Sequence, residues 1–136
     1  MFESINEIAV CATAAVYIAV SIIWYSQTLF GKVWSTASSA TPTKLAYQQK
    51  HLVEQLLGIY ISNVLVCGIL AYAISITPLL KVSVTTLAIS VTVFVWSFLA
   101  ILSLSEYKSR LYFLVHAGYV ALFIIGATMI LNYWPW

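Results

Sequence analysis

Four long apolar stretches dominate the chain, at about residues 5–25, 52–76, 79–104 and 111–132. A helix needs roughly 20 apolar residues to cross about 30 Å of hydrocarbon, and these stretches approach or exceed that length. We therefore expect an all-α polytopic integral membrane protein with four transmembrane helices in an antiparallel bundle. Residues 1–136 would then form a single four-helix transmembrane domain.

The polar segment at about residues 26–51 is rich in Ser, Thr, Gln and Lys, and it predicts a sizeable loop outside the membrane. Thr41 and Pro42 within it are typical of a helix start. Thr caps free N–H groups there, and proline loses no hydrogen bond at the first helical position. We expect the second helix to begin near Pro42 and to enter the membrane near Leu52.

The same Thr-Pro pair recurs at Thr77-Pro78, between the second and third apolar stretches. The pattern predicts that the second helix stops there and that the third starts almost at once, at about residue 79. A turn this short would join the two helices as an antiparallel hairpin.

The composition of the chain indicates whether its surface faces water or lipid. Its 136 residues are 62% hydrophobic and 7% charged, whereas a soluble domain carries roughly 25% charged residues. A lipid bilayer must therefore be the main partner of its surface. The six basic residues are scattered through the loops, which gives no clustered patch for nucleic acid. Cys11 and Cys67 lie far from any metal-ligand spacing, so we expect no metal and no cofactor.

The distribution of positive charge among the loops predicts the orientation of the protein in the membrane. The first and third loops carry most of the lysine and arginine, whereas the opposite side has Lys81 with Glu3 and Glu7. Basic loops stay in the cytoplasm. We therefore expect a multi-pass protein of the cell (inner) membrane with both termini outside. The basic loop residues are Lys32, Lys44, Lys50, Lys108 and Arg110.

An aromatic segment ends the first apolar stretch, and reads Trp24-Tyr25-Ser26 followed by Leu29-Phe30-Gly31-Lys32 and Trp34. Trp and Tyr have an apolar body and a polar tip, which suits them to the headgroup layer. Lys32 can extend its stem along apolar surface and keep its ammonium in water. This segment therefore marks one face of the membrane.

The segment resembles the WYSP…LFGKxW signature of the bacterial domain of unknown function 1761 family, with Gln27 where the family usually has proline. Ala117-Gly118-Tyr119 resembles a second short patch of that family. The resemblance implies a four-helix membrane protein with a longer first loop. It implies no reaction, because the family has no established activity. The motif or interface residues that it singles out are Trp24, Tyr25, Ser26, Phe30, Gly31, Lys32, Trp34 and Gly118.

A candidate polar site follows from topology, because the second and fourth helices start at the same face. We expect His51, Glu54 and Gln55 to lie level with His116 and Tyr119. Ionisable groups inside a span are costly, which makes them functional candidates.

Each of these groups also has a structural interpretation. Glu54 could pair at the interface with Lys50, four residues earlier. His116 could be a neutral imidazole bonded to Glu54 or Tyr25, a proton-transfer group, or a metal or haem ligand, for which no ligand spacing exists. We predict that Glu54 and His116 interact.

Asn63 lies in the middle of the second helix, where a polar side chain most often joins helices by hydrogen bonding. Glycine at Gly118 and Gly126 would let another helix approach the fourth one closely. Asn63, Ser62 and Ser90 could alternatively line a narrow substrate path.

Two hypotheses for function remain open. The first is a non-enzymatic small carrier or accessory component that acts as a homo-oligomer on a small-molecule ligand we cannot name. The second is a membrane enzyme, or a redox or proton-transfer protein, that uses a cluster of His51, Glu54 and His116 at the cytoplasmic end. Absorbance and metal content of the purified protein would separate the two.

Overall fold

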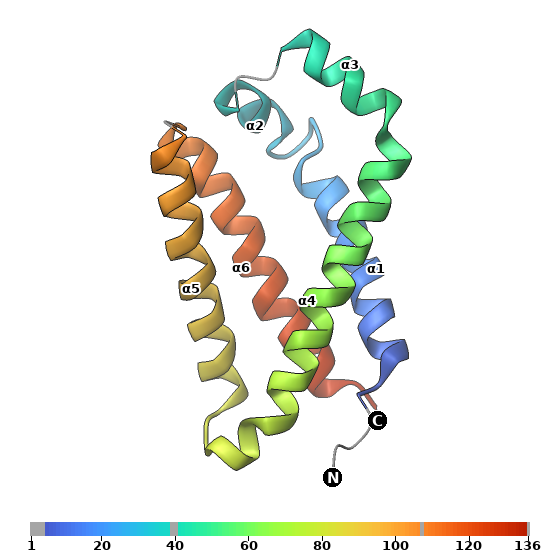
Figure 1. The fold of residues 1–136 in the computed structure, drawn as a ribbon, viewed down its shortest axis with the longest axis vertical. Helices are drawn as coiled ribbons and strands as arrows, with labels where there is room; N and C mark the ends of the chain where they lie inside the picture. The colour runs from blue at the N-terminus through green and yellow to red at the C-terminus, as the bar shows by residue number, and fades with distance from the viewer. Residues whose placement is uncertain (1–4, 39–40, 107, 136) are drawn as a thin grey trace.

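The computed structural model describes residues 5–38, 41–106 and 108–135. Helices are the only regular elements over these residues, and long apolar helices account for most of them (Figure 1). The four that are long and apolar enough to cross a membrane are α1, α4, α5 and α6. The helices are α1 (Glu7–Trp24), α2 (Gly31–Ala37), α3 (Pro42–Lys50), α4 (Leu52–Leu80), α5 (Val84–Ser105) and α6 (Arg110–Tyr133).

Helix α6 contacts all three of the other long helices, α1, α4 and α5, and also the short helix α2. Helix α1 packs mainly on α4, and α5 packs mainly on α6. The short helices α2 and α3 lie at one end of the molecule, where α1 ends and α6 begins (Figure 1). We call this the signature end. The opposite end holds the connection between α4 and α5 at residues 81–83.

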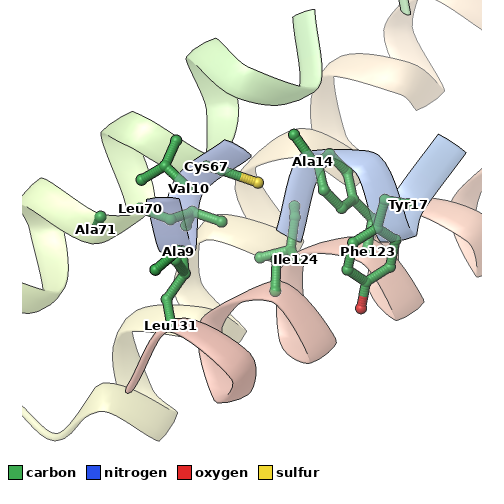
Figure 2. Close-up of a cluster of buried hydrophobic side chains, with 11 residues drawn as sticks. Ala9, Val10, Ala14, Tyr17, Cys67, Leu70, Ala71, Phe123, Ile124 and Leu131 are labelled. Atoms are coloured by element: carbon green, nitrogen blue, oxygen red, sulfur yellow. The ribbon is translucent and has the colours of Figure 1, made fainter. Parts of the chain in front are cut away.

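The buried core lies between α1, α4 and α6 (Figure 2). Ala9, Ala14 and Ala127 are completely buried, and such small side chains let helices approach closely. Large apolar side chains instead cover the outside, as Phe94 and Leu104 do on α5. An outer surface of this kind suits lipid. The core residues are Ala9, Val10, Ala14, Tyr17, Cys67, Leu70, Ala71, Phe123, Ile124, Ala127 and Leu131.

Helix α4 continues through Pro78 to Leu80, so the predicted stop at Thr77-Pro78 is wrong. Pro78 has no N–H with which to bond the carbonyl of Ile74, four residues earlier. The hydroxyl of Thr77 donates to that same carbonyl at 2.8 Å. The pair therefore supplies its own replacement hydrogen bond, and the helix passes through it.

The turn comes three residues later. Lys81 ends α4 with φ 52°, in the left-handed conformation that commonly closes a helix. Ser83 then caps α5, and its hydroxyl accepts a hydrogen bond from the N–H of Thr86 at 3.0 Å. Helix α5 therefore begins at Val84 and not at about residue 79.

The expected loop at residues 26–51 contains two short helices, α2 and α3. The predicted start at Thr41 and Pro42 is confirmed, because the Thr41 hydroxyl accepts from the N–H of Lys44 at 3.3 Å. The helix that starts there does not run on into the membrane without interruption. His51, with φ −108° and ψ 24°, separates α3 from α4.

Candidate functional site

The chain reverses direction between α1 and α2 in a tight turn. The N–H of Phe30 donates to the carbonyl of Trp24 at 3.1 Å, and the N–H of Gly31 donates to that of Ser26 at 2.8 Å. The Ser26 hydroxyl donates to the carbonyl of Ile23 at 2.7 Å. The aromatic segment identified from the sequence is therefore a compact turn that closes on the end of α1.

Gly31 is required for this closure. A Cβ atom at Gly31 would lie 2.5 Å from the carbonyl oxygen of Tyr25 and 2.6 Å from that of Ser26. Backbone atoms cannot move aside as the tip of a side chain can, so only glycine fits here.

Trp24 joins this turn to α6. Its indole N–H donates to the carbonyl of Val115 at 3.2 Å, and its ring lies 4.5 Å from the ring of Phe30. A Cβ atom at Gly118 would lie 3.0 Å from Cζ2 of Trp24. Gly118 therefore makes room for the indole, which confirms its predicted place on a contact face.

His116 binds the turn and α2 at the same time. Its Nδ1 lies 2.7 Å from the hydroxyl of Tyr25, and its Nε2 accepts a hydrogen bond of 3.1 Å from the indole N–H of Trp34. An indole nitrogen can only donate, so Nε2 carries no proton. The neutral imidazole therefore has its proton on Nδ1 and donates it to Tyr25, an assignment that follows from the network.

Tyr25 is partly buried and packs against neighbouring aromatic rings. Its ring lies 5.8 Å from that of Trp34 and 5.6 Å from that of Tyr119. Burial raises the pKa of the Tyr25 phenol well above its ordinary value. Tyr25 is therefore a neutral partner for His116 throughout the physiological pH range.

The predicted polar cluster separates into two parts. His51 and Glu54 contact each other, with Nδ1 and Oε2 3.1 Å apart, whereas both ring nitrogens of His116 are occupied by Tyr25 and Trp34. The predicted interaction of Glu54 with His116 is therefore wrong, and Tyr25 is confirmed as the partner among the alternatives. The Glu54 side chain is 78% exposed.

Glu54 also differs from its structural interpretation, since it pairs with His51 where Lys50 was expected. Gln55, in the same turn of α4, is half-buried. These residues belong to the edge of the molecule and not to its centre.

The deeper candidates hold helices together. Asn63 is buried, and its amide donates to the carbonyl of Ala14 at 3.4 Å. The hydroxyl of Tyr119 donates to the carbonyl of Tyr17 at 3.2 Å. Asn63 therefore joins α4 to α1, as expected, and Tyr119 joins α6 to α1.

Sequence reasoning missed two similar contacts. The indole of Trp96 donates to the carbonyl of Ala117 at 2.8 Å, and the hydroxyl of Tyr17 donates to that of Leu122 at 3.1 Å. The signal was present, because the polar tip of a Trp or Tyr in the middle of a span needs a partner.

Two cavities adjoin at the signature end. The larger, of about 730 Å³, lies where α2 faces the connection between α5 and α6. We call it the Lys32 cavity. The smaller, of about 150 Å³, lies beside His116 and Tyr112, and Glu106 lines both. The Lys32 cavity is lined by Lys32, Val33, Thr36, Ala37, Glu106, Lys108, Ser109 and Leu111.

Sequence reasoning did not bring Glu106 together with Lys32. The two residues are far apart in the chain, and their approach depends on how α2 packs against α6. In the described part of the chain, no group of three or more His, Cys, Asp or Glu residues is placed to hold a metal ion.

Four membrane-length helices, an apolar outer surface and interhelical bonds made by aromatic donors define a multi-pass membrane protein. The chain belongs to the family described as protein of unknown function DUF1761, whose model matches residues 8–132. That range contains both the turn at Trp24 and the contact at Gly118. No curated protein and no solved structure matches the chain.

Proposed function

We propose that the protein is a non-enzymatic membrane component, a small carrier or accessory protein, that binds its ligand in the Lys32 cavity. The observation that carries this proposal is the placement of α2. Helix α2 supplies Lys32 and Thr36 to the cavity, and Trp34 on its other side is bonded to His116. The turn and the histidine therefore serve to position one side of a binding cavity.

The same geometry disfavours the enzyme hypothesis. A general acid or base must reach the reacting group with a free nitrogen or oxygen. Both nitrogens of His116 are occupied, and the His51 and Glu54 pair lies elsewhere, at the start of α4. Nothing in this arrangement favours a reaction over binding.

We place the four spans as an antiparallel bundle in the cell (inner) membrane, with the signature end in the cytoplasm and both termini outside. The distribution of basic residues supports this orientation. A cysteine at Ser38 should then react with an impermeant thiol reagent from the cytoplasm only, and one at Val82 from outside only. The reverse labelling would reject the orientation.

We further propose that the protein works as a homo-oligomer. Helix α5 contributes no residue to the core cluster and leaves large apolar side chains such as Phe94 exposed. A second copy could cover that face. Chemical cross-linking in native membranes tests this, and a purely monomeric pattern would contradict it.

The ligand-binding proposal is tested by filling the cavity. Thr36→Trp should displace the bound molecule, whereas Leu29→Trp, on an exposed position of the turn that does not line the cavity, should leave it in place. Native mass spectrometry of the gently extracted protein measures what remains bound. Equal retention by wild type and Thr36→Trp, with unchanged thermal stability, would reject the cavity as the binding site.

A further inference from the structure

The charges around the Lys32 cavity point to the class of its ligand. Lys32 comes from α2, Lys108 precedes α6, and Glu106 follows α5. Across the residues that the structure describes, the one salt bridge joins His51 to Glu54. The cavity therefore holds two cations and one carboxylate that are not paired with one another.

Unpaired charges of both signs around one cavity favour a ligand that carries both signs itself. The Lys108 ammonium lies 5.6 Å from the centre of the Tyr112 ring, a contact that leaves its N–H donors available for an anion. Lysine binds phosphate as a mobile point charge with three donors. Glu106 can only accept hydrogen bonds, and it would repel a second anionic group.

The remaining lining is partly apolar. Val33, Ala37 and Leu111 lie around the same cavity as the charged groups. A polar ligand alone would gain nothing from this surface, whereas the glycerol and first methylene groups of a lipid would be shielded from water by it.

The position of the cavity relative to the expected headgroup layer also fits a lipid. It adjoins the turn whose Trp24, Tyr25 and Trp34 are suited to the headgroup layer. Its volume of about 730 Å³ lies within the range of roughly 300–1,000 Å³ that is usual for small-ligand sites.

We infer that the Lys32 cavity takes a phospholipid whose headgroup carries a phosphate and a primary ammonium. The phosphate would lie between Lys32 and Lys108, and the ammonium would donate hydrogen bonds to Glu106. This inference rests on the proposed function, because it names the ligand of that same cavity.

The test compares three lipids on delipidated protein in detergent, with native mass spectrometry as the readout. Phosphatidylethanolamine has the primary ammonium, phosphatidylcholine has a quaternary ammonium without N–H groups, and phosphatidylglycerol has neither. We expect phosphatidylethanolamine to bind about tenfold more tightly than the other two, since among the three only its ammonium can donate a charge-assisted hydrogen bond to Glu106.

Single-residue variants then test which side chain binds the phosphate and which binds the ammonium. Lys32→Ala and Lys108→Ala should each weaken binding of phosphatidylethanolamine about tenfold through loss of a phosphate contact. Glu106→Gln should remove the preference among the three lipids. Lys44→Ala removes one positive charge from α3, outside the cavity, and should change neither affinity nor preference.

The outcomes separate this inference from the proposed function. Binding of a different molecule that Thr36→Trp displaces would overturn the inference and leave the proposed function standing. Tighter binding of phosphatidylglycerol, or an unchanged preference in Glu106→Gln, would overturn the ammonium assignment. Full displacement of the lipid by an equal concentration of free phosphoethanolamine would show that the headgroup alone is recognised. That result would overturn the assignment of a lipid as the ligand. Retention of lipid unaffected by Thr36→Trp would overturn both.

Discussion

Helices α5 and α6 are equally apolar but have different surroundings. Both are long and apolar enough to cross a membrane, yet a much smaller share of α5 than of α6 is buried inside the protein. Helix α6 contacts α1, α2, α4 and α5. Hydropathy therefore identifies a span but does not say whether the span lies at the centre of the protein or at its lipid-facing surface.

The difference lies in small residues and in carbonyl acceptors. Helix α6 has glycine at Gly118 and Gly126, against which Trp24 and Tyr17 of the α1 region are packed. Its backbone carbonyls also accept hydrogen bonds from Trp24, Trp96 and Tyr17. Helix α5 has no glycine and instead presents large exposed side chains, among them Phe94 and Leu104.

The largest effect should come from the turn that α6 binds. Gly31→Ala places a Cβ atom against two backbone carbonyl oxygens, which should destabilise the protein by about 3 kcal/mol, at the upper end of overpacking effects. Gly58→Ala on α4 is the control, because no atom other than those of its chain neighbours and the surrounding helix backbone lies within 4 Å of its Cβ position. Thermal unfolding in detergent measures both. Similar melting temperatures for the two variants would contradict the backbone contact.

The next effect should come from the contact of α6 with α2. His116→Leu removes two hydrogen bonds and leaves the Trp34 indole without its acceptor, which should cost about 2 kcal/mol. Glu54→Gln, at an exposed pair, should have no measurable effect. Comparable losses in the two variants would contradict the exposed, weakly stabilising role of Glu54.

These residues also show how far the sequence could lead. The four spans follow from the length and apolarity of their segments, and the place of the aromatic turn follows from the polar tips of Trp and Tyr. Tyr25 could be named as one partner of His116. Trp34 could not be named as the other partner of His116, because its position depends on helix α2. The composition of that segment had predicted a loop.

The errors have local physical causes. Thr77-Pro78 has the same sequence as Thr41-Pro42, but the Thr77 hydroxyl donates a hydrogen bond to the carbonyl of Ile74, and the helix continues. Equal depth on two helices suggested a contact between Glu54 and His116, yet depth does not determine the direction in which a side chain points. The Lys32 cavity could not be predicted, since it forms only when segments distant in sequence pack together.

A smaller effect should come from the contact between α5 and α6 themselves. Trp96→Phe removes the hydrogen bond to the carbonyl of Ala117 and should cost about 1 kcal/mol, the usual net value of one such bond. Phe94→Leu, on the exposed side of α5, should leave the stability of the isolated protein unchanged. A larger loss from Phe94→Leu than from Trp96→Phe would mean that α5 packs through its other face.

The smallest effect isolates a single contact on α6. Gly118→Ala and Gly68→Ala both replace a helical glycine, which in water favours alanine by up to about 1 kcal/mol. Apart from its chain neighbours and the surrounding helix backbone, Gly68 has no atom within 4 Å of its Cβ position, whereas that of Gly118 lies 3.0 Å from the Trp24 ring. The backbone contribution is common to both variants, so the difference in their unfolding free energies measures how far Trp24 must move. We expect Gly118→Ala to be less stable than Gly68→Ala by about 0.5–1 kcal/mol, within the range of mild overpacking. Repeating both changes in a Trp24→Phe background should remove the difference, since a phenyl ring does not reach as far as the indole. A difference that persists there would assign the strain to another neighbour of Gly118.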